Sequence, residues 1–316
     1  MNISYSIPLS SAWTRMKKAL FQPFDIGKWF TVGFTAFLAS LMNNTAGTGG
    51  YNPSKSYGDT DWQDLAEWPT IAWYWLMDHP VWFSFIIVGV VFLIAIFVIL
   101  TWVSSRGKFM FLDNVVHDRA EVVIPWNEYR NEGNSLFIWR LVFGLISFFL
   151  LVISFIIAFM VMIDLFTGES TLMAKAFSLL PVFFGFLVLI LFIAFITLLL
   201  NDFIVPVMYK HRITTTQAWL KFLPLLLSNF WDFIVYALFV FVLIIITVFA
   251  VIFFGIFTCC IGFLLLIIPY IGSVVLLPVT YTFRAFSISF IEQYGDDFTL
   301  FPKPETTNLS EQSGIN

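Results

Sequence analysis

Few residues in this chain have the type and spacing needed for catalysis or metal binding. The three histidines, His79, His117 and His211, form no H-E-x-x-H arrangement, and the adjacent Cys259 and Cys260 lack metal-ligand spacing. There is also no Gly-rich phosphate loop and no G-x-S-x-G motif. We therefore predict no catalytic residue, no metal site and no cofactor, and classify the protein as non-enzymatic.

Four ionisable side chains lie close to the inner ends of long apolar stretches: Arg140, Asp202, Asp232 and Arg284. An unpaired charge in hydrocarbon costs several kcal/mol, so such residues tend to pair. We expect Arg140 to pair with Asp202 or Asp232 and to lock helices together within the membrane. The alternative is that each side chain extends to the nearby membrane surface.

Basic and aromatic side chains recur together just before apolar stretches, at Trp13, Lys17, Lys18, Trp126, Lys210, Arg212 and Trp219. Indole rings favour the membrane interface, and each Lys or Arg near the surface attracts anionic headgroups by about 1 kcal/mol. These residues are our candidates for binding lipid headgroups, or a partner protein in the membrane or cytoplasm. No nucleic-acid partner is expected. The first of these segments, within residues 1–28, has the pattern of an amphipathic helix in the inner headgroup region.

The composition places these residues in a membrane. Hydrophobic residues make up 59% of the chain, charged residues only 11%, and there are 40 phenylalanines. A soluble domain of 316 residues could not cover so much apolar surface with so few polar side chains. The sequence therefore predicts an all-α integral membrane protein.

Six apolar stretches could cross the bilayer, at about residues 29–42, 81–103, 136–163, 177–200, 230–257 and 263–290. Residues 81–103 form the clearest span, because they are free of charge and long enough for about 30 Å of hydrocarbon. The first stretch is short. A cleaved signal peptide is its alternative, although the charged leader is long and no clear cleavage site follows.

Prolines interrupt the sixth stretch. Pro269, Gly272 and Pro278 predict a kinked or locally unwound helix. Broken membrane helices can expose backbone carbonyls to a substrate, so a transporter or channel with its path beside this helix is the alternative function. No acidic residue lies in the middle of an apolar stretch, where an ion-coupled transporter would place one, and this counts against that alternative.

The distribution of positive charge predicts the orientation. Of the 16 Lys and Arg residues, only Lys55 and Lys175 fall on the side opposite the N-terminus, which leaves fourteen on the inner side. By the positive-inside rule, both termini face the cytoplasm. We predict a multi-pass protein of the cytoplasmic membrane, with the mixed-charge segment 106–140 as a water-facing inner loop.

A spacing shared by three tryptophans indicates an internal repeat. Trp13, Trp126 and Trp219 each precede a phenylalanine by eleven residues, at the entry to an apolar stretch. We predict three parallel repeats of an interfacial helix plus a two-span hairpin, at about residues 1–105, 106–205 and 206–291. All belong to one membrane domain, residues 1–291, with an outer interfacial loop at 43–80. Residues 292–316 are predicted to be a disordered cytoplasmic tail.

The central segment also resembles known sequences. Its motifs are Arg106-Gly107-x-Phe109-x-Phe111-Leu112-Asp113, Pro125-Trp126, Gly133-Asn134-Ser135 and Trp139-Arg140, with Ala12-Trp13 leading to Pro23-Phe24 upstream. On these residues the chain is similar to uncharacterised prokaryotic six-span membrane families, including the membrane domain joined to some glycerophosphodiester phosphodiesterases. No counterpart of that catalytic domain is present in these residues. The resemblance therefore implies a domain of unassigned activity, in agreement with a lipid- or partner-binding membrane module.

Overall fold

A computed structural model describes residues 3–42, 62–167, 172–258 and 261–302, and within these ranges the chain is helical, with no β-strand. In chain order the elements are α1 (Ser6–Phe21), α2 (Ile26–Ser40), α3 (Trp62–Asp78), α4 (Pro80–His117), α5 (Val123–Glu128), α6 (Arg130–Thr167), α7 (Leu172–Leu199), the π-helix η1 (Leu200–Ile204), α8 (Val205–His211), α9 (Thr215–Ser228), α10 (Phe230–Phe257), α11 (Ile261–Ile267), α12 (Pro269–Val275), α13 (Leu277–Ile291) and the 3₁₀ helices η2 (Glu292–Tyr294) and η3 (Asp296–Phe298). The prediction of an all-helical protein is confirmed.

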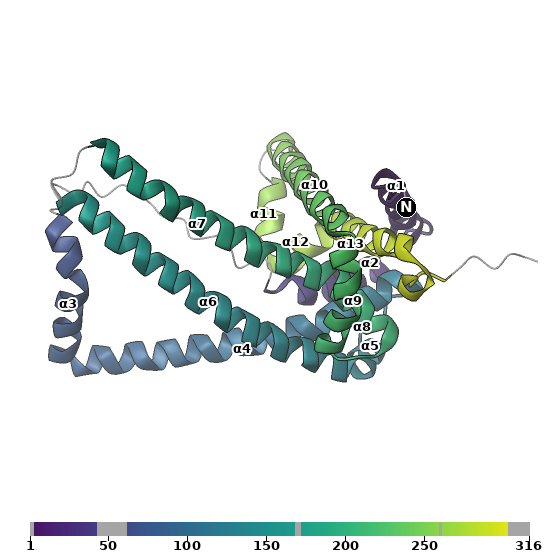
Figure 1. Ribbon diagram of the computed structural model, residues 1–316. Coiled ribbons are helices and arrows are strands. Elements are labelled where there is room, and N and C mark those ends of the chain that lie inside the picture. The colour runs from purple at the N-terminus through teal and green to yellow at the C-terminus, as the bar shows by residue number, and fades with distance from the viewer. Residues whose placement is uncertain (1–2, 43–61, 168–171, 259–260, 303–316) are drawn as a thin grey trace, which may run out of the picture.

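Four helices of the described chain are long and apolar enough to cross a membrane: Pro80–His117, Arg130–Ile163, Phe177–His211 and Phe230–Phe257. Figure 1 shows α4, α6 and α7 reaching away from a cluster of shorter helices, with α6 and α7 side by side and α4 diverging from them. Their outer parts leave apolar side chains such as Phe92, Phe149 and Phe183 exposed. Water would not tolerate so large an apolar surface, but lipid covers it at no cost, as expected for a membrane protein.

The first and sixth predicted spans have a different form. Helix α2 has 15 residues, which is short of the roughly 20 that cross a bilayer. The sixth stretch is divided into α11, α12 and α13, with breaks at Ile268 and Leu276. Ile268 takes an extended conformation because the following Pro269 disfavours a helical one. Four spanning helices are therefore supported directly, and the count of six stays a prediction.

The central inner loop is much shorter than predicted. Helix α4 continues through Arg106 to His117, and Asp118 ends it in the left-handed conformation, at φ 52°. This extension is buried rather than water-facing, since Phe109, Leu112 and neighbouring apolar residues join the core. The sequence misled us because its charged residues suggested solvent, whereas the apolar residues between them hold the helix in the interior.

Close helix packing joins the short helices into one cluster. Helix α1 packs along α13, while α2 packs between α4 and α12. At Gly107, a Cβ atom would lie 2.7 Å from the backbone of Leu38 and Ala39, and at Gly33 it would lie 2.6 Å from Val274 Cγ2. Only glycine allows α2 to approach both neighbours this closely.

The segment after α13 also corrects a prediction. Residues 292–302, expected to begin a disordered tail, form η2 and η3 and bury Phe298 and Phe301. The Glu292 carboxylate accepts hydrogen bonds from the backbone N–H groups of Leu300 and Phe301, both at 2.8 Å. Buried aromatic rings and a capped turn stabilise this part of the tail. Residues 303–316 lie outside the described chain.

Helix α3 lies across the far ends of α4 and α6, opposite the cluster that contains α1, α5, α8 and α9 (Figure 1). Its Trp73, Tyr74 and Trp75 are exposed, as aromatic side chains at a membrane surface would be. Residues 43–61, the first part of the predicted outer loop, lie outside the described chain.

Candidate functional site

Trp13 stands at the centre of an apolar groove between α1, α10 and α13, which we call the Trp13 groove. Three adjoining hollows of about 180, 360 and 370 Å³ all include Trp13 in their walls. The walls are otherwise formed mainly by apolar side chains: Leu9, Met16, Phe21, Phe239, Leu243, Ile246, Pro278, Val279, Phe283 and Phe286. Trp13 itself is 49% exposed, so it presents an open apolar surface rather than a filled core position.

Two of the predicted headgroup-binding cations border this groove or lie beside it. Lys17 lines one of the hollows, and its Nζ lies 5.4 Å from the centre of the Trp13 ring. Lys18 is the next residue along α1, and both side chains are exposed. In the described chain neither lysine forms an ion pair, so both charges are open to a ligand.

The other predicted headgroup residues are engaged elsewhere. Trp126 packs against Trp102, with ring centres 5.6 Å apart, and against the Arg106 guanidinium at 5.0 Å. Trp219 stacks on Trp139 at 5.7 Å. The seven predicted residues therefore do not form one site, because of these seven only Trp13 and Lys17 line the groove.

Lys210 and Arg212 hold the inner cluster together. The Lys210 ammonium donates to the backbone carbonyl of Asp296. Arg212 forms an ion pair with Glu128 and covers the Tyr129 ring at 3.9 Å. These contacts connect α8 with α5 and with the segment after α13, and they leave each cation partly committed to the protein.

Neither expected ion pair, Arg140 with Asp202 or with Asp232, lies within 4.0 Å in the described chain. Arg140 Nη1 instead donates to Ser104 Oγ and Ser105 Oγ, each at 3.2 Å. Tyr236 donates its hydroxyl proton to Asp202 at 2.9 Å, and Asp232 lies 3.5 Å from the Tyr294 hydroxyl. Arg284 donates to the Asn201 carbonyl at 2.7 Å. Helices are linked through neutral partners at these positions.

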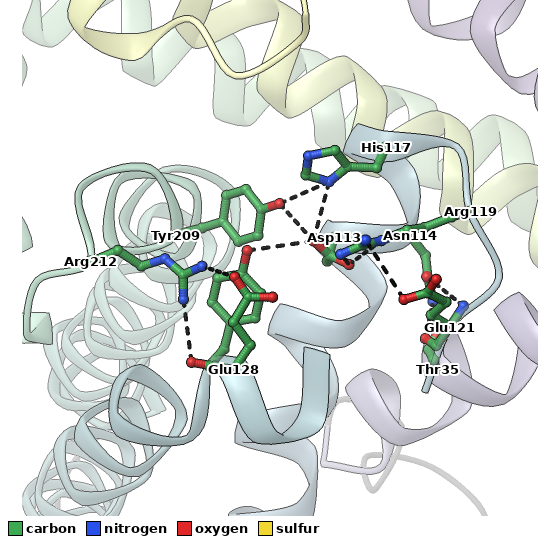
Figure 2. A network of polar contacts seen from close by, with 10 residues as sticks. Thr35, Asp113, Asn114, His117, Arg119, Glu121, Glu128, Tyr209 and Arg212 are labelled. Atoms are coloured by element: carbon green, nitrogen blue, oxygen red, sulfur yellow. Dashed lines mark hydrogen bonds and ion pairs between the residues drawn. The ribbon is translucent and has the colours of Figure 1, made fainter. Parts of the chain in front are cut away.

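A buried carboxylate, Asp113, forms the hub of a polar network at the inner end of α4 (Figure 2). Its side chain is fully buried and accepts two hydrogen bonds from the Arg119 guanidinium, at 2.9 and 2.6 Å. Tyr209 donates to it at 2.8 Å, Tyr129 at 3.4 Å, and His117 Nδ1 lies 3.2 Å away. The groups around the carboxylate thus come from α4, the loop after α4, the residue between α5 and α6, and α8.

The surroundings of this hub extend across the short helices. Asn114 donates to Thr35 Oγ1 at 3.3 Å and exchanges two hydrogen bonds with the Glu121 backbone, each at 3.0 Å. Burial raises the pKa of Tyr129 to about 12, so this hydroxyl keeps its proton at neutral pH. For Arg119, burial alone would lower the pKa, but hydrogen bonding to Asp113 and its charge raise it above the usual value. The network links donors and acceptors around the α4–α6 connection, and it leaves the buried Glu121 Oε2 without a hydrogen bond, 3.6 Å from Arg119 Nη1.

Sequence reasoning missed both Asp113 and the buried Lys108 one and a half turns before it. Lys108 is 2% exposed, and its ammonium donates to Asn201 Oδ1. Both residues occur in a segment whose charges suggested a solvated loop. A signal was present in the apolar residues at helical spacing through 109–116, which continue the preceding span without a proline.

Within the described residues, no group of three His, Cys, Asp or Glu side chains could hold a metal ion. The geometry therefore offers an apolar groove with adjacent cations and a buried polar network. Within the polar network, the Tyr209 hydroxyl lies 3.2 Å from His117 Nδ1, and both groups also contact Asp113.

Comparison with known proteins assigns a family but no activity. No curated protein and no solved structure matches the chain. A link to the membrane domains of glycerophosphodiester phosphodiesterases is not shown. One family model, described as a family of unknown function (DUF7544), matches residues 8–298 and thus nearly the whole sequence. The chain belongs to this family of unknown function.

Proposed function

We propose that the protein is a non-enzymatic, multi-pass module of the cytoplasmic membrane that binds anionic lipid along the Trp13 groove. Six spans, with both termini in the cytoplasm, complete the proposal. The observation that carries it is the combination of an open apolar groove with Lys17 in its wall and the exposed Lys18 next along α1. Acyl chains would lie against the apolar wall while the lysines attract the headgroup phosphate.

The size and chemistry of the groove support a lipid ligand. Two of its hollows, at about 360 and 370 Å³, fall within the range of roughly 300–1,000 Å³ typical of small-molecule sites. Their walls combine aliphatic and aromatic side chains with few polar atoms. A chain-like apolar ligand suits this composition better than a polar metabolite, which would leave its hydrogen-bonding groups unpaired.

The positions of the chain ends support the orientation. The N-terminal residues and the segment after α13 lie at the same end of the molecule as α5, α8 and α9, opposite α3 (Figure 1). Ser4 and Gln293 exchange two hydrogen bonds, at 3.0 and 2.9 Å, which hold the two ends together. With the Lys and Arg residues concentrated at this end, it would face the cytoplasm.

The packing supports the threefold repeat. Helix α5 packs on α4, α9 packs on η1 and α8, and α1 packs on α13, so each short helix contacts the hairpin before it and α1 closes the ring. The residues three positions after the repeated tryptophans, Met16, Tyr129 and Phe222, are all buried. Tyr129 stacks on Phe109 and Phe222 stacks on Phe203, each from the preceding hairpin. Matching contacts of this kind favour an internal repeat over chance similarity.

Lipid retention tests the proposed function. We would purify wild type and the double variant Lys17→Gln, Lys18→Gln in the same mild detergent and measure co-purified phosphatidylglycerol by mass spectrometry. Removing both cations should lower the retention of anionic lipid about ten-fold or more, because each charge contributes about 1 kcal/mol of attraction to the headgroup. Arg130→Gln is the matched control, because Arg130 is an exposed inner cation that lines none of these hollows. Equal lipid content in the double variant and the control would contradict the proposal that anionic lipid binds along the Trp13 groove.

Transport beside the broken sixth helix is the alternative, and the contacts of that helix give it no specific support. Tyr270 on α12 lies among Phe30, Phe34 and Phe37 of α2, and its hydroxyl donates to the Phe30 carbonyl at 3.0 Å. These contacts are apolar and close. Kinship with the membrane domain joined to glycerophosphodiester phosphodiesterases likewise remains a proposal, and it would agree with lipid binding.

A further inference from the structure

Three cations meet where α4, α6, η1, α10 and α13 converge, and we call Lys108, Arg140 and Arg284 the cation cluster. Lys108 and Arg284 both donate to Asn201, to its side-chain and backbone oxygens respectively. Arg140 donates to Ser104 and Ser105, one turn before Lys108 on α4. The charges of Arg140 and Arg284 both act on Lys108, so the three form one electrostatic unit.

The positive charge of this cluster is not balanced by the protein around it. Asp202 is the carboxylate whose charge acts on both Lys108 and Arg284, so three basic side chains share one acidic side chain. In the described chain none of the three cations lies within 4.0 Å of a carboxylate. Buried charge in a protein is normally paired, so an excess of this kind calls for an anion.

The π-helix η1 contributes to the site. Val205 N–H donates to the Leu200 carbonyl, five residues earlier. At the same spacing, the next donor to the Asn201 carbonyl would be the backbone nitrogen of Pro206. Pro206 has no N–H, so the Asn201 carbonyl is free to accept from Arg284. Asn201 of the widened turn therefore accepts hydrogen bonds from both Lys108 and Arg284. π-Helical turns are frequent at functional sites.

The depth of the cluster relates it to lipid. At 1.5 Å per residue, Lys108 lies about 14 Å before the inner end of α4 at His117, and Arg140 about 15 Å after the start of α6. Beyond this level α4 diverges from α6 and α7 (Figure 1). The outer parts of these helices leave apolar side chains exposed. Arg140, Asp202 and Arg284 are half-buried, so their side chains retain open surface. Lys108 itself is buried, so Arg140 and Arg284 are the members of the cluster that retain open surface, next to an apolar region.

We infer that Lys108, Arg140 and Arg284 bind a phosphate group, supplied by the headgroup of a phospholipid whose acyl chains lie between the diverging helices. Arginine offers planar paired donors to phosphate and lysine a point charge. The inference rests on the proposed membrane embedding, but it concerns a site distinct from the Trp13 groove. Free inorganic phosphate shares the recognised chemistry, and the experiment below separates the two sources.

Ligand-dependent thermal stabilisation of the delipidated full chain in detergent would test the site. Phosphatidylglycerol should raise the midpoint of unfolding, whereas diacylglycerol with the same acyl chains should not. Lys108→Met and Arg140→Gln should each weaken phosphatidylglycerol binding about ten-fold or more, because each removes a charged donor. Arg140→Lys keeps the charge and should retain most of the affinity. If Lys108→Met fails to fold, the Arg140 pair alone decides the result.

The remaining arms identify the source and separate the two sites. If millimolar inorganic phosphate stabilises wild type and competes with phosphatidylglycerol, free phosphate is supported as the ligand. If phosphatidylglycerol stabilises the protein and inorganic phosphate does not, the lipid headgroup is supported. Equal stabilisation by diacylglycerol, or unchanged affinity in both cluster variants, would overturn the inference. If only the double variant Lys17→Gln, Lys18→Gln loses affinity for phosphatidylglycerol, the cation cluster is overturned as the binding site and the Trp13 groove is upheld. If only the cluster variants lose affinity, the cluster is upheld and the groove is overturned.

Discussion

Asp113 and Lys108 lie one and a half turns apart on α4, and both are almost completely buried, yet their surroundings are opposite. Asp113 receives a guanidinium and two tyrosine hydroxyls. Lys108 donates to one amide oxygen, that of Asn201, and has two further cations nearby. The same helix therefore carries one charge that the fold compensates and another that it leaves in excess.

This difference separates a structural charge from one available to a ligand. A buried charge with its partners in place stabilises the arrangement of helices around it, and removing one partner is costly. A buried charge without a counterion destabilises the free protein and gains its partner only on binding. The predictions below follow from this contrast.

Removing the Asp113 charge should have the largest effect. Asp113→Asn leaves the Arg119 guanidinium and the tyrosine hydroxyls without their acceptor, and breaking a buried pair costs about 3–5 kcal/mol. We expect a loss near the lower limit, because the Arg119 side chain is 32% exposed and regains some hydration. Chemical or thermal unfolding in detergent measures the change.

Asp118→Asn is the control for this variant. Asp118 pairs with Lys28 at 2.9 Å on the surface, and asparagine tolerates the left-handed conformation that Asp118 adopts. Exposed ion pairs contribute about 0–1 kcal/mol, so this variant should unfold close to wild type. A similar loss in both variants would show that general charge, rather than the network around Asp113, determines stability.

Removing the Lys108 charge should have a smaller effect of opposite sign. In delipidated protein, Lys108→Met replaces an unbalanced buried cation by an apolar chain of similar length, and such exchanges are neutral or stabilising by about 1–4 kcal/mol. We expect the low end, since Asn201 loses its donor. Unfolding measured without added phospholipid tests this. A loss as large as that of Asp113→Asn would mean that Lys108 is structural and that the contrast fails.

The sequence predicted the apolar helices well and the polar interior poorly, for physical reasons. The span predicted at about residues 230–257 matches α10, because a long apolar run with its one charge near the end has one interpretation. Lys108 and Asp113 were missed because local composition cannot tell a solvated charge from one paired across helices. Their partners Asn201 and Tyr209 lie more than ninety residues away, and only the fold brings them together.

The role of Tyr129 gives the smallest expected effect and the most specific one. At neutral pH, Tyr129→Phe removes only a 3.4 Å hydrogen bond to Asp113 and should cost about 0.5 kcal/mol.

At high pH, the free energy of unfolding should depend on pH more steeply in wild type than in Tyr129→Phe. Burial raises the pKa of Tyr129 from 10.0 to about 12, so the fold favours the neutral phenol. This contribution is complete below pH 10 and is lost as the pH rises from 10 towards 12. Wild type should therefore lose stability more steeply than Tyr129→Phe over that range, while Tyr74→Phe, exposed on α3, should follow wild type. Parallel curves for wild type and Tyr129→Phe would mean that the phenol is hydrated in the folded protein, and that the network around Asp113 is open to water rather than closed.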